Sequence, residues 1–507
     1  MSLARQLAGF WSTERARTRL VAVAAIAFAA GVPSVFRPEY CLDDSYIHLD
    51  YVRSLKLGEG LSYNPHDWAT GMTSPLWVLV LAAWPFGMPP VWFVKGLGVV
   101  LHAIGTALVL LVLQRSTPAI DARAQWLGAL LWAGSPLAVH AAGSGMEVSL
   151  ATSLVLGYVY CALRERERWA AGFAALATLA RPELACFVAL CAAGLSALRR
   201  RPGPALSLLA TLAASGAYAL YCQRVSGYPL PNTYYVKSRP IAWENLRYLI
   251  VEVLPQDSVV RSIVGIYLVG SGVAGCWRAR RWPLSVVGTS ALATLIAVAA
   301  TRALYPGVDF AQSRYFVPLL WIWSVWCALG ASALARRVAL PLSAAVVVVA
   351  GLGLPQRLQL QIRQEHGIGR LHVEPAHYIR ERVPNARVLG VEGAGALRYF
   401  TPRALRVIDV VGLNDRTLAH MRGDRLGRFC YLRDAGVTHF AYPLPWRARL
   451  STAFELQTLA SFTQPAYAQV DPAIDWTVVV AKVLATRTDF SRRCDAHAGT
   501  ETSSRRP

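Results

Sequence analysis

The stretch "CLDDSYIHLDYVRSLKLGEGLSYNP", Cys41 to Pro65, places two adjacent carboxylates directly after the first long apolar segment of the chain. That segment, 20–36, has no convincing small-residue cleavage site, so it is predicted to be a membrane anchor and not a cleaved signal peptide. On a soluble surface, the pair Asp43 and Asp44 would carry little information. At the edge of a bilayer, where ionisable groups are costly, the same pair is a candidate chemical centre.

The composition is that of a polytopic membrane protein. Of the 507 residues, 54% are hydrophobic and only 16% are charged, and the mean hydropathy is +0.36. Soluble domains contain about 25% charged residues. The net charge is +21, but the arginines lie in short clusters between apolar runs, which is typical of topology determinants and argues against nucleic-acid binding. The nine cysteines show no metal-ligand spacing, and we predict neither a metal nor another cofactor.

Six basic clusters determine the predicted topology, because the positive-inside rule places all of them in the cytoplasm. They are Arg15/Arg17/Arg19, Arg115/Arg123, Arg164/Arg166/Arg168, Arg199/Arg200/Arg201, Arg278/Arg280/Arg281 and Arg336/Arg337. The crossings that satisfy this rule are 20–36, 91–114, 124–141, 147–163, 170–180, 184–197, 204–224, 258–276, 283–300, 316–334 and 338–354. The apolar run 75–86 is too short to span and is predicted to be an interfacial or re-entrant helix.

The predicted fold is therefore an all-α membrane domain over 1–355, with about eleven transmembrane helices, followed by an extracytoplasmic α/β domain over 356–507. The N-terminus is predicted to be cytoplasmic. In the second domain, four apolar runs bounded by turn signals are typical of strands: "ARVLGVEG", "LRVIDVVGL", "VTHFAYP" and "DWTVVVAKV". A polar tail follows from about Ser491.

Polar side chains recur where the predicted helices end on the outer side. The first outer loop, 37–90, carries the Asp pair, and later outer turns carry Glu147, Arg181, Glu183, Asn232, Tyr235, Lys237, Arg314 and Tyr315. Their repeated appearance at one level predicts a shared polar cavity, although snorkelling at the interface is the alternative for each Arg or Lys. Carboxylates beside cations suit sugar transfer from a lipid phosphate, because the cations neutralise the leaving phosphate and a carboxylate accepts the proton of the incoming hydroxyl.

Within the pair, we predict that Asp43 is the base. The loop helix is expected to begin near Ser45, which makes Asp44 the more natural helix cap.

The stretch from Asp43 to Trp77, "DDSYIHLDYVRSLKLGEGLSYNPHDWATGMTSPLW", resembles the first-loop signature of the GT-C glycosyltransferases, polytopic enzymes that use polyprenyl-phosphate sugars. It is most similar to the branch that contains the mycobacterial terminal β-(1→2)-arabinofuranosyltransferase. The later stretches "GMEVSL", "LARPEL", "PNTYYVK" and "SRYFVP" resemble further motifs of that branch in the same order. By motif, the resemblance covers roughly residues 1–320, and it covers the tail more loosely through "GALRYFTPRALRVIDVVGLND".

The resemblance implies a multi-pass enzyme of the inner (plasma) membrane. Such an enzyme moves a sugar, with inversion of the anomeric configuration, from a polyprenyl-phosphate donor to a cell-envelope glycan, glycolipid or glycoprotein on the outer face. The resemblance suggests that the sugar is arabinofuranose. Carried over by position, Asp43 or Asp44 is the catalytic base, and Arg181, Lys237 and Arg314 bind the lipid phosphate. Contacts to the sugar or acceptor fall to Glu147, Glu183, Asn232, Tyr235 and His48. Two departures, Val148 in place of Thr and Asp50 in place of a basic residue, bear on sugar specificity more than on reaction class.

Three alternatives stay open. The same reaction could use mannose or another sugar, with lipid or protein as the acceptor. A transporter or flippase of lipid-linked sugars is the main rival, and a non-catalytic scaffold that displays the outer domain is the second. In the oxidising outer compartment Cys430 and Cys494 could pair, with unpaired thiols or a pairing with Cys41 as the alternatives.

Overall fold

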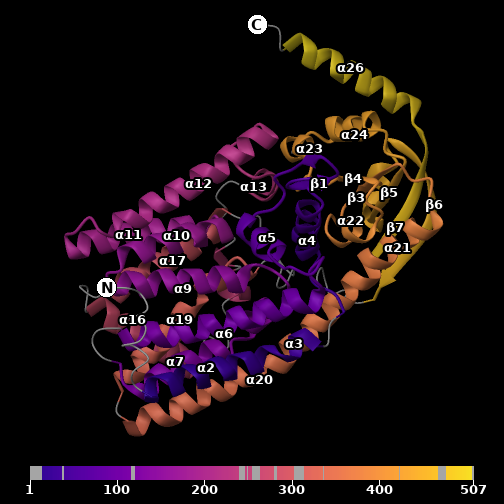
Figure 1. The fold of residues 1–507 in the computed structure, drawn as a ribbon. Coiled ribbons are helices and arrows are strands. Elements are labelled where there is room, and N and C mark those ends of the chain that lie inside the picture. The colour runs from indigo at the N-terminus through magenta and orange to yellow at the C-terminus, as the bar shows by residue number, and fades with distance from the viewer. Residues whose placement is uncertain are drawn as a thin grey trace. The chain divides into compact units, whose positions relative to one another are not determined.

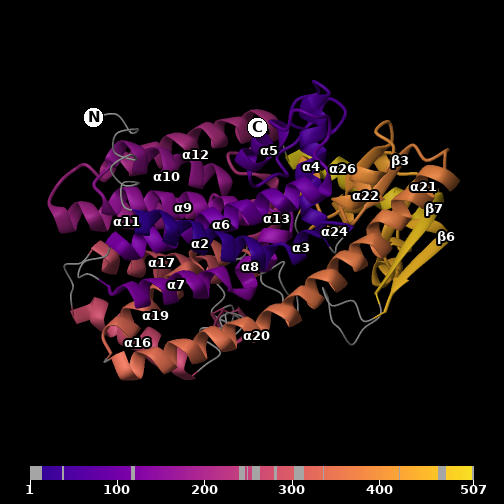
Figure 2. The ribbon, with the colours of Figure 1, turned by 60° about the horizontal axis from the view of Figure 1, so that its bottom comes forward.

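The computed structural model describes residues 14–36, 39–115, 120–238, 246–247, 249–253, 263–278, 283–301, 313–334, 336–421, 423–465 and 476–504. These residues form two compact units (Figures 1 and 2). Unit 1 contains 1–38, 90–217 and 239–362, and unit 2 contains 39–89, 218–238 and 363–507. The predicted boundary at residue 355 stays a prediction of where the membrane domain ends. By internal contacts, the first outer loop and 218–238 group with the C-terminal residues.

Unit 1 is built from apolar helices that pack side by side. Its described helices are α2 (Glu14–Gly31), α3 (Pro33–Phe36), α6 (Val91–Arg115), α7 (Ala122–Ala133), α8 (Pro136–Gly143), α9 (Val148–Leu163), α10 (Glu167–Ala180), α11 (Leu184–Arg199), the π-helix η1 (Leu249–Val253), α16 (Ile263–Arg278), α17 (Pro283–Thr301) and α19 (Val317–Ser332). Helices α12 (Ala205–Ser226) and α20 (Arg336–Ile368) begin in unit 1 and end in unit 2. Helix α6 packs against α2, α7 and α9, and α16 packs against α19.

The number of crossings predicted from the sequence stays a prediction. By length and composition, five described helical stretches can cross a membrane, or six if the pair α8 and α9, bent by 120°, is one span. The five are Thr18–Phe36, Val91–Arg115, Ala205–Ser226, Pro283–Thr301 and Ala344–Arg382. Helix α10 has 14 residues, fewer than the roughly 20 that a span needs. Part of the predicted crossing 258–276 lies outside the described residues.

Two predicted crossings differ in their helices. The run 124–141 was expected to be one helix, but it divides into α7 and α8 at Gly134 because Ser135 caps α8 and Pro136 occupies its first turn. The run 338–354 was expected to end before the outer domain. Instead α20 continues through Pro355 to Ile368 as a helix of 33 residues. The loop run 75–86 forms α5 (Pro75–Ala82), a helix of eight residues.

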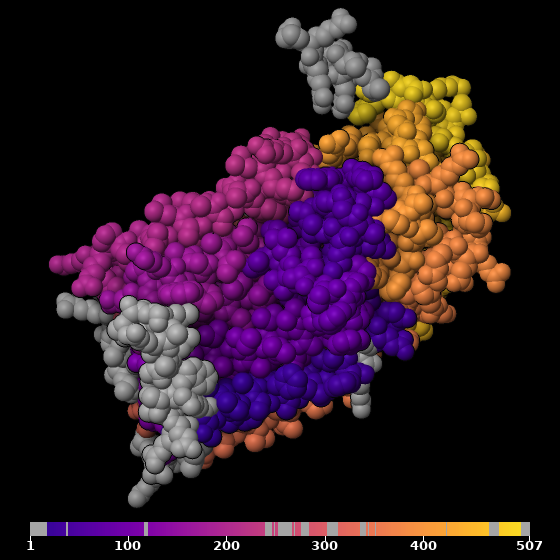
Figure 3. All heavy atoms as spheres, viewed as in Figure 1, coloured from indigo at the N-terminus to yellow at the C-terminus, as the bar shows by residue number. Residues whose placement is uncertain are grey.

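Unit 2 joins the first loop to an α/β sheet domain. Its helical segments in the loop and linker are α4 (Asp43–Lys56), α5 and α13 (Asn232–Lys237), and a hairpin joins β1 (Ser62–Asn64) to β2 (Asp67–Trp68). Helix α4 packs against α22 (Ala396–Phe400), and α13 packs against α23 (Arg416–His420). Figure 3 shows the indigo and violet surface of the loop bordering the orange surface of the C-terminal residues.

The sheet has five strands in the order β4-β3-β5-β7-β6. They are β3 (Val388–Val391), β4 (Arg406–Asp409), β5 (His439–Pro443), β6 (Phe454–Gln464) and β7 (Trp476–Thr486). Strand β3 pairs in parallel with β4 and β5, whereas β7 is antiparallel to both β5 and β6. The remaining helical segments are η3 (Gly369–Val373), α21 (Glu374–Arg382), α24 (Arg425–Asp434), η4 (Leu444–Trp446), α25 (Arg447–Leu450) and α26 (Thr488–Ser504). The predicted α/β character of the tail is confirmed.

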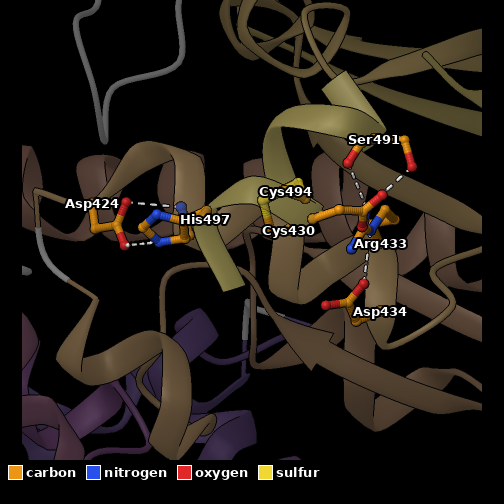
Figure 4. Close-up of a disulfide and its surroundings, with 9 residues drawn as sticks. Asp424, Cys430, Arg433, Asp434, Ser491, Cys494 and His497 are labelled. Atoms are coloured by element: carbon orange, nitrogen blue, oxygen red, sulfur yellow. Dashed lines mark hydrogen bonds and ion pairs between the residues drawn. A yellow bond between two sulfur atoms is a disulfide. The ribbon is translucent and has the colours of Figure 1, made fainter. Parts of the chain in front are cut away.

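A disulfide joins α24 to α26 between Cys430 and Cys494 (Figure 4). The polar tail expected from about Ser491 is therefore a helix attached to the domain. The Arg433 guanidinium donates to the Ser491 carbonyl at 3.0 Å and pairs with the Asp495 carboxylate at 2.9 Å. Cys41, the alternative partner, is a buried thiol.

Candidate active site

The Asp pair occupies the first turn of α4, and it does not cap that helix. Helix α4 begins at Asp43, with Leu42 at the N-cap position and no side-chain cap. The expectation that α4 begins near Ser45 with Asp44 as its cap is therefore wrong. Both carboxylates lie where the helix dipole favours negative charge. The reason for preferring Asp43 as the base disappears with the cap.

Asp43 holds the loop that follows β3. Its carboxylate oxygens accept hydrogen bonds from the backbone N–H groups of Gly395, at 3.1 Å, and Ala396, at 2.8 Å. A Cβ atom at Gly395 would lie 1.8 Å from the Asp43 carbonyl oxygen, so this approach requires glycine. The His372 Nδ1 lies 3.8 Å from the same carboxylate. Asp43 is thus fixed on both oxygens by backbone donors.

Asp44 faces a cation. The Lys237 ammonium, at the end of α13, lies 3.5 Å from an Asp44 carboxylate oxygen, and both side chains are about one quarter exposed (28% and 27%). Segments almost two hundred residues apart in the sequence are thus brought to one place within unit 2. The pair combines an acid with a cation that can bind an anion, which is the combination expected from the sequence.

Two further acids near the pair were not singled out from the sequence. Glu392 directly follows β3 and is partly buried, and Asp409 ends β4 and is fully buried. Burial raises the pKa of Glu392 from its ordinary 4.5 to about 7, and the charges of Asp43, Asp409 and Asp44 contribute to the rise. Burial likewise raises the pKa of Asp409 to about 6, although backbone N–H donors from Asn414, Gly412 and Val411 oppose the rise.

A usable signal for these two acids was present in the sequence. Glu392 directly follows β3 and Asp409 is the last residue of β4, so both lie at the carboxyl ends of parallel strands, where α/β sheets commonly place their sites. The glycines of "VEGAGAL" mark a close backbone approach, since a Cβ at Gly393 would lie 2.1 Å from His372 Nδ1.

The other predicted sugar contacts in unit 2 have different surroundings. Asn232 is fully buried, and neither of its side-chain amide atoms has a hydrogen-bond partner among the described residues. A buried amide without a partner is costly, and a ligand hydroxyl would satisfy it. The ring centroids of Tyr235 and His420 lie 4.3 Å apart. The His420 ring also stacks on the Tyr228 ring, with 3.5 Å between their centroids. His48 is buried within α4.

The remaining predicted residues form a separate cluster within unit 1. The Arg181 guanidinium pairs with the Glu147 carboxylate at 2.8 Å and with the Glu183 carboxylate at 2.7 Å. The guanidiniums of Arg181 and Arg314 lie 5.0 Å and 5.4 Å from the Tyr315 ring centroid. Three turns supply these residues: the one before α9, the one between α10 and α11, and the one before α19. The structure therefore brings the predicted residues of these three turns together within unit 1.

The electrostatic character of the unit 1 cluster is balanced. Two arginines and two glutamates share it, and Glu147, Arg181 and Arg314 are each at most 5% exposed. One Glu147 carboxylate oxygen has no hydrogen-bond partner among the described residues. To bind a phosphate, Arg181 would have to exchange part of its carboxylate contacts for phosphate oxygens. In the described ranges, no group of three or more His, Cys, Asp or Glu side chains is arranged to hold a metal ion.

Comparison with known proteins gives a match to part of the tail and a likeness of the whole fold. A family model described as a domain of unknown function, DUF8728, matches residues 359–495. No curated protein matches the chain. ArnT from Cupriavidus metallidurans resembles it at 14% identity, with TM-scores of 0.61 in the apo state and 0.58 bound to undecaprenyl phosphate. Each alignment covers 92% of this chain and 98% of that one.

Two further solved structures are less similar. The archaeal oligosaccharyltransferase AglB from Archaeoglobus fulgidus, solved with an inhibitory peptide and a dolichol-phosphate, matches with a TM-score of 0.53 at 11% identity, covering 86% of this chain and 70% of that one. Arabinofuranosyltransferase AftD from Mycobacteria reaches only 0.46 at 14% identity, covering 93% of this chain and 42% of that one, which carries no argument for the arabinofuranosyl branch. The fold of this chain is therefore similar to the folds of ArnT and AglB.

Proposed function

We propose that this chain is a membrane glycosyltransferase that moves a sugar from a polyprenyl-phosphate donor to a hydroxyl group of a cell-envelope acceptor on the outer face. The observation that carries the proposal is the ion pair of Asp44 with Lys237 beside Asp43 in the first turn of α4. It joins a proton acceptor, in the loop whose sequence resembles the GT-C signature, to a cation at the end of α13. The GT-C fold, with 92% of the chain aligned to ArnT, supports the same reaction class.

The proposed reaction exchanges one bond at the anomeric carbon for another. The bond from the sugar C1 to the phosphate oxygen breaks, and polyprenyl phosphate leaves with the electron pair. The acceptor hydroxyl oxygen forms the new bond to C1 and gives its proton to a carboxylate. Lys237 offsets the charge that develops on the departing phosphate. A single displacement of this kind inverts the configuration at C1.

Within the pair, we assign the base to Asp44. Asp43 accepts backbone hydrogen bonds on both oxygens, whereas the carboxylate of Asp44 is 27% exposed and faces Lys237. Asp43 then positions the 393–395 loop against α4. Glu392 lies among these acids, and the pKa of about 7 suits it to take up the proton afterwards.

The other predicted residues take supporting roles. Arg181 and Arg314 bind the lipid phosphate, and Glu147 and Glu183 orient Arg181. Asn232 donates to or accepts from a sugar hydroxyl, which would satisfy its buried amide, while Tyr235 and His48 serve the acceptor side. The membrane domain crosses about eleven times, with a cytoplasmic N-terminus and the C-terminal domain outside.

Two solved structures of similar fold support a donor with a lipid phosphate. The similar structures ArnT and AglB were solved with undecaprenyl phosphate and a dolichol-phosphate. The motif series in the first 320 residues suggests arabinofuranose as the sugar, with mannose as the next candidate. The proposal includes a plasma-membrane location.

Substitution of each carboxylate tests the proposal. The purified chain in liposomes is supplied with radiolabelled polyprenyl-phosphate arabinofuranose or polyprenyl-phosphate mannose, together with a cell-envelope glycan fraction. We expect Asp44→Asn to lower the transfer rate about 10²–10⁴-fold while the donor still binds, and Asp43→Asn to be less severe. Asp434→Asn, which changes an exposed carboxylate on α24, is the matched control and should transfer normally.

Normal transfer by both variants would remove the pair from the catalytic centre. An inactive Asp43→Asn with an active Asp44→Asn would reverse the two roles. Movement of an intact donor across the bilayer, with no release of polyprenyl phosphate, would favour the flippase.

A further inference from the structure

Unit 2 contains a polar pocket of about 220 Å³ to which neither the Asp pair nor Lys237 contributes. The β1–β2 hairpin of the first loop forms one wall, and β4 with the 414–417 segment and α24 forms the other. The lining side chains that matter for recognition are Asp67, Trp68, Arg406, Asp415, Arg416 and Tyr431. A volume of this size accommodates one sugar ring.

Trp68 provides an aromatic surface that is both exposed and held in place. It is 51% exposed, although large aromatic side chains usually bury most of their area. Its ring lies on Gly60, where an added Cβ would be 2.6 Å from the ring, and its backbone pairs with Ser62 in the hairpin. The Tyr221 ring lies 6.5 Å away. An exposed aromatic plane fixed from behind is suited to stacking against the C–H face of a sugar.

The charges around the pocket are balanced. Two carboxylates, Asp67 and Asp415, and two guanidiniums, Arg406 and Arg416, line it. Asp415 is fixed by the backbone N–H groups of Thr417 and Leu418, at 3.0 and 2.9 Å, and by the Tyr431 hydroxyl at 2.8 Å. Within the part of the chain that the structure describes, the side chains of Asp67, Arg406 and Arg416 form no ion pair. The four charged side chains of the lining therefore carry no net formal charge.

A second pocket of the same unit has the opposite character. It measures about 320 Å³ and is lined by Arg425, Arg428 and Arg449 with Trp446, and no carboxylate is among its described lining residues. That lining would favour an anion. By contrast, the balanced lining beside Trp68 favours a neutral polyhydroxyl ligand.

The pocket is tied rigidly to α4, which carries the Asp pair. The Asn64 side chain donates to the Val407 carbonyl and accepts from its N–H, both at 2.9 Å. The Asn414 side chain accepts from the Tyr51 hydroxyl of α4 at 3.1 Å. A ligand held in the pocket is therefore held at a fixed place relative to the start of α4.

We propose that this pocket is a binding subsite for a neutral sugar residue of the acceptor glycan. That the bound sugar belongs to the acceptor rests on the proposed function. Sugar binding itself needs neither donor nor turnover. The ring stacks on Trp68, and its hydroxyls donate to Asp67 and accept from Arg416. The sugar residue bound here belongs to the acceptor chain and is distinct from the one being transferred.

Binding is tested without donor, with the full-length protein in nanodiscs and two neutral probes, an arabinofuranosyl hexasaccharide and a mannopyranosyl hexasaccharide. Ligand-detected saturation-transfer NMR gives the affinity. At least one probe is expected to bind, with Trp68→Ala weakening it about tenfold or more and Trp68→Tyr restoring much of the loss, since about 1.4 kcal/mol corresponds to tenfold. Trp169→Ala removes an equally exposed tryptophan (50%) from α10 and should have no effect.

The failure of this inference can be told from the failure of the proposed function. Asp44→Asn should bind the probe as the wild type does, because the pocket does not include the Asp pair. The subsite is refuted if neither probe binds the wild type, or if Trp68→Ala and Asp67→Asn bind as tightly as the wild type. If the protein bound the sugar but transferred none, the binding subsite would be supported and the proposed glycosyltransferase activity would be refuted.

Discussion

Glu392→Gln should stabilise the protein at pH 8 and leave it almost unchanged at pH 4. Burial, with the charges of neighbouring carboxylates, raises the folded pKa of Glu392 from its ordinary 4.5 to about 7. A group whose folded pKa is raised contributes stability that is fully present below its unfolded pKa and is lost as the pH rises through the folded pKa. At pH 8 the wild-type carboxyl is ionised among other acids, whereas glutamine has nearly the same shape and no charge.

The size of the effect follows from the two pKa values. They differ by about 2.5, and each pKa unit corresponds to about 1.4 kcal/mol, so the upper limit at pH 8 is about 3 kcal/mol. The difference between wild type and variant should develop between the two pKa values, from 4.5 to about 7. Asp409, whose pKa burial raises to about 6, adds its own pH dependence to both proteins.

Unfolding of the full-length protein in detergent, followed by tryptophan fluorescence at pH 4 and pH 8, measures the effect. Glu455→Gln removes an exposed carboxylate from β6 and should show no pH-dependent difference from the wild type. If Glu392→Gln and the wild type had the same stability difference at both pH values, Glu392 would titrate as an ordinary surface acid. The acidic environment assigned to it would then be wrong.

Four further outcomes are expected. Cys494→Ser opens a disulfide that spans 64 residues, so it should cost up to about 4 kcal/mol, and hydrogen exchange should show faster exchange in α26. Asp50→Asn removes the carboxylate charge that lies 3.6 Å from the buried guanidinium of Arg398. Denaturant unfolding should show a loss of about 3–5 kcal/mol in the free energy of unfolding. A loss below about 1 kcal/mol would mean that this ion-pair network is dispensable. Arg181→Ala should weaken binding of polyprenyl phosphate in a flotation assay, whereas Arg201→Ala, a change in an exposed arginine, should not. A reporter after Pro507 should be extracytoplasmic and one after Arg201 cytoplasmic, and a cytoplasmic C-terminal reporter would contradict the topology.

Periodicity and charge predicted the fold class because they reflect forces that act locally along the chain. Apolar runs marked the helices of unit 1, and four apolar runs bounded by turn signals marked β3, β4, β5 and β7. The strand β6 was not singled out. It is the edge strand beside β7, its burial alternates weakly, and "FELQTLASFTQ" is too polar to resemble a core strand.

The pairing of distant segments could not be predicted from local patterns. Asp50 looked like an unexplained departure from the family pattern, but it is the buried centre of a cluster that includes Arg398 and Arg403. Those arginines lie about 350 residues away, and only the folded chain brings them together. For the same reason the sequence indicated Asp44 and Lys237 as separate candidates and could not show their ion pair.

The assignment within the Asp pair shows a limit of another kind. The argument for Asp43 depended on the first residue of a helix, and helix boundaries are uncertain by one or two residues. A shift of two positions, from Ser45 to Asp43, removed the cap on which the choice depended. The hydrogen bonds from Gly395 and Ala396 then supplied a physical reason for the other choice.

The most direct test of the central claim is product analysis with the wild-type protein alone. The purified chain in proteoliposomes is given polyprenyl-phosphate arabinofuranose or polyprenyl-phosphate mannose and a cell-envelope glycan fraction, and mass spectrometry follows both lipid and glycan. The proposed function predicts that free polyprenyl phosphate and a glycan one sugar residue heavier appear in equal amounts, and that Asp44→Asn abolishes both. Intact donor in both leaflets with no heavier glycan, for either sugar, would contradict it.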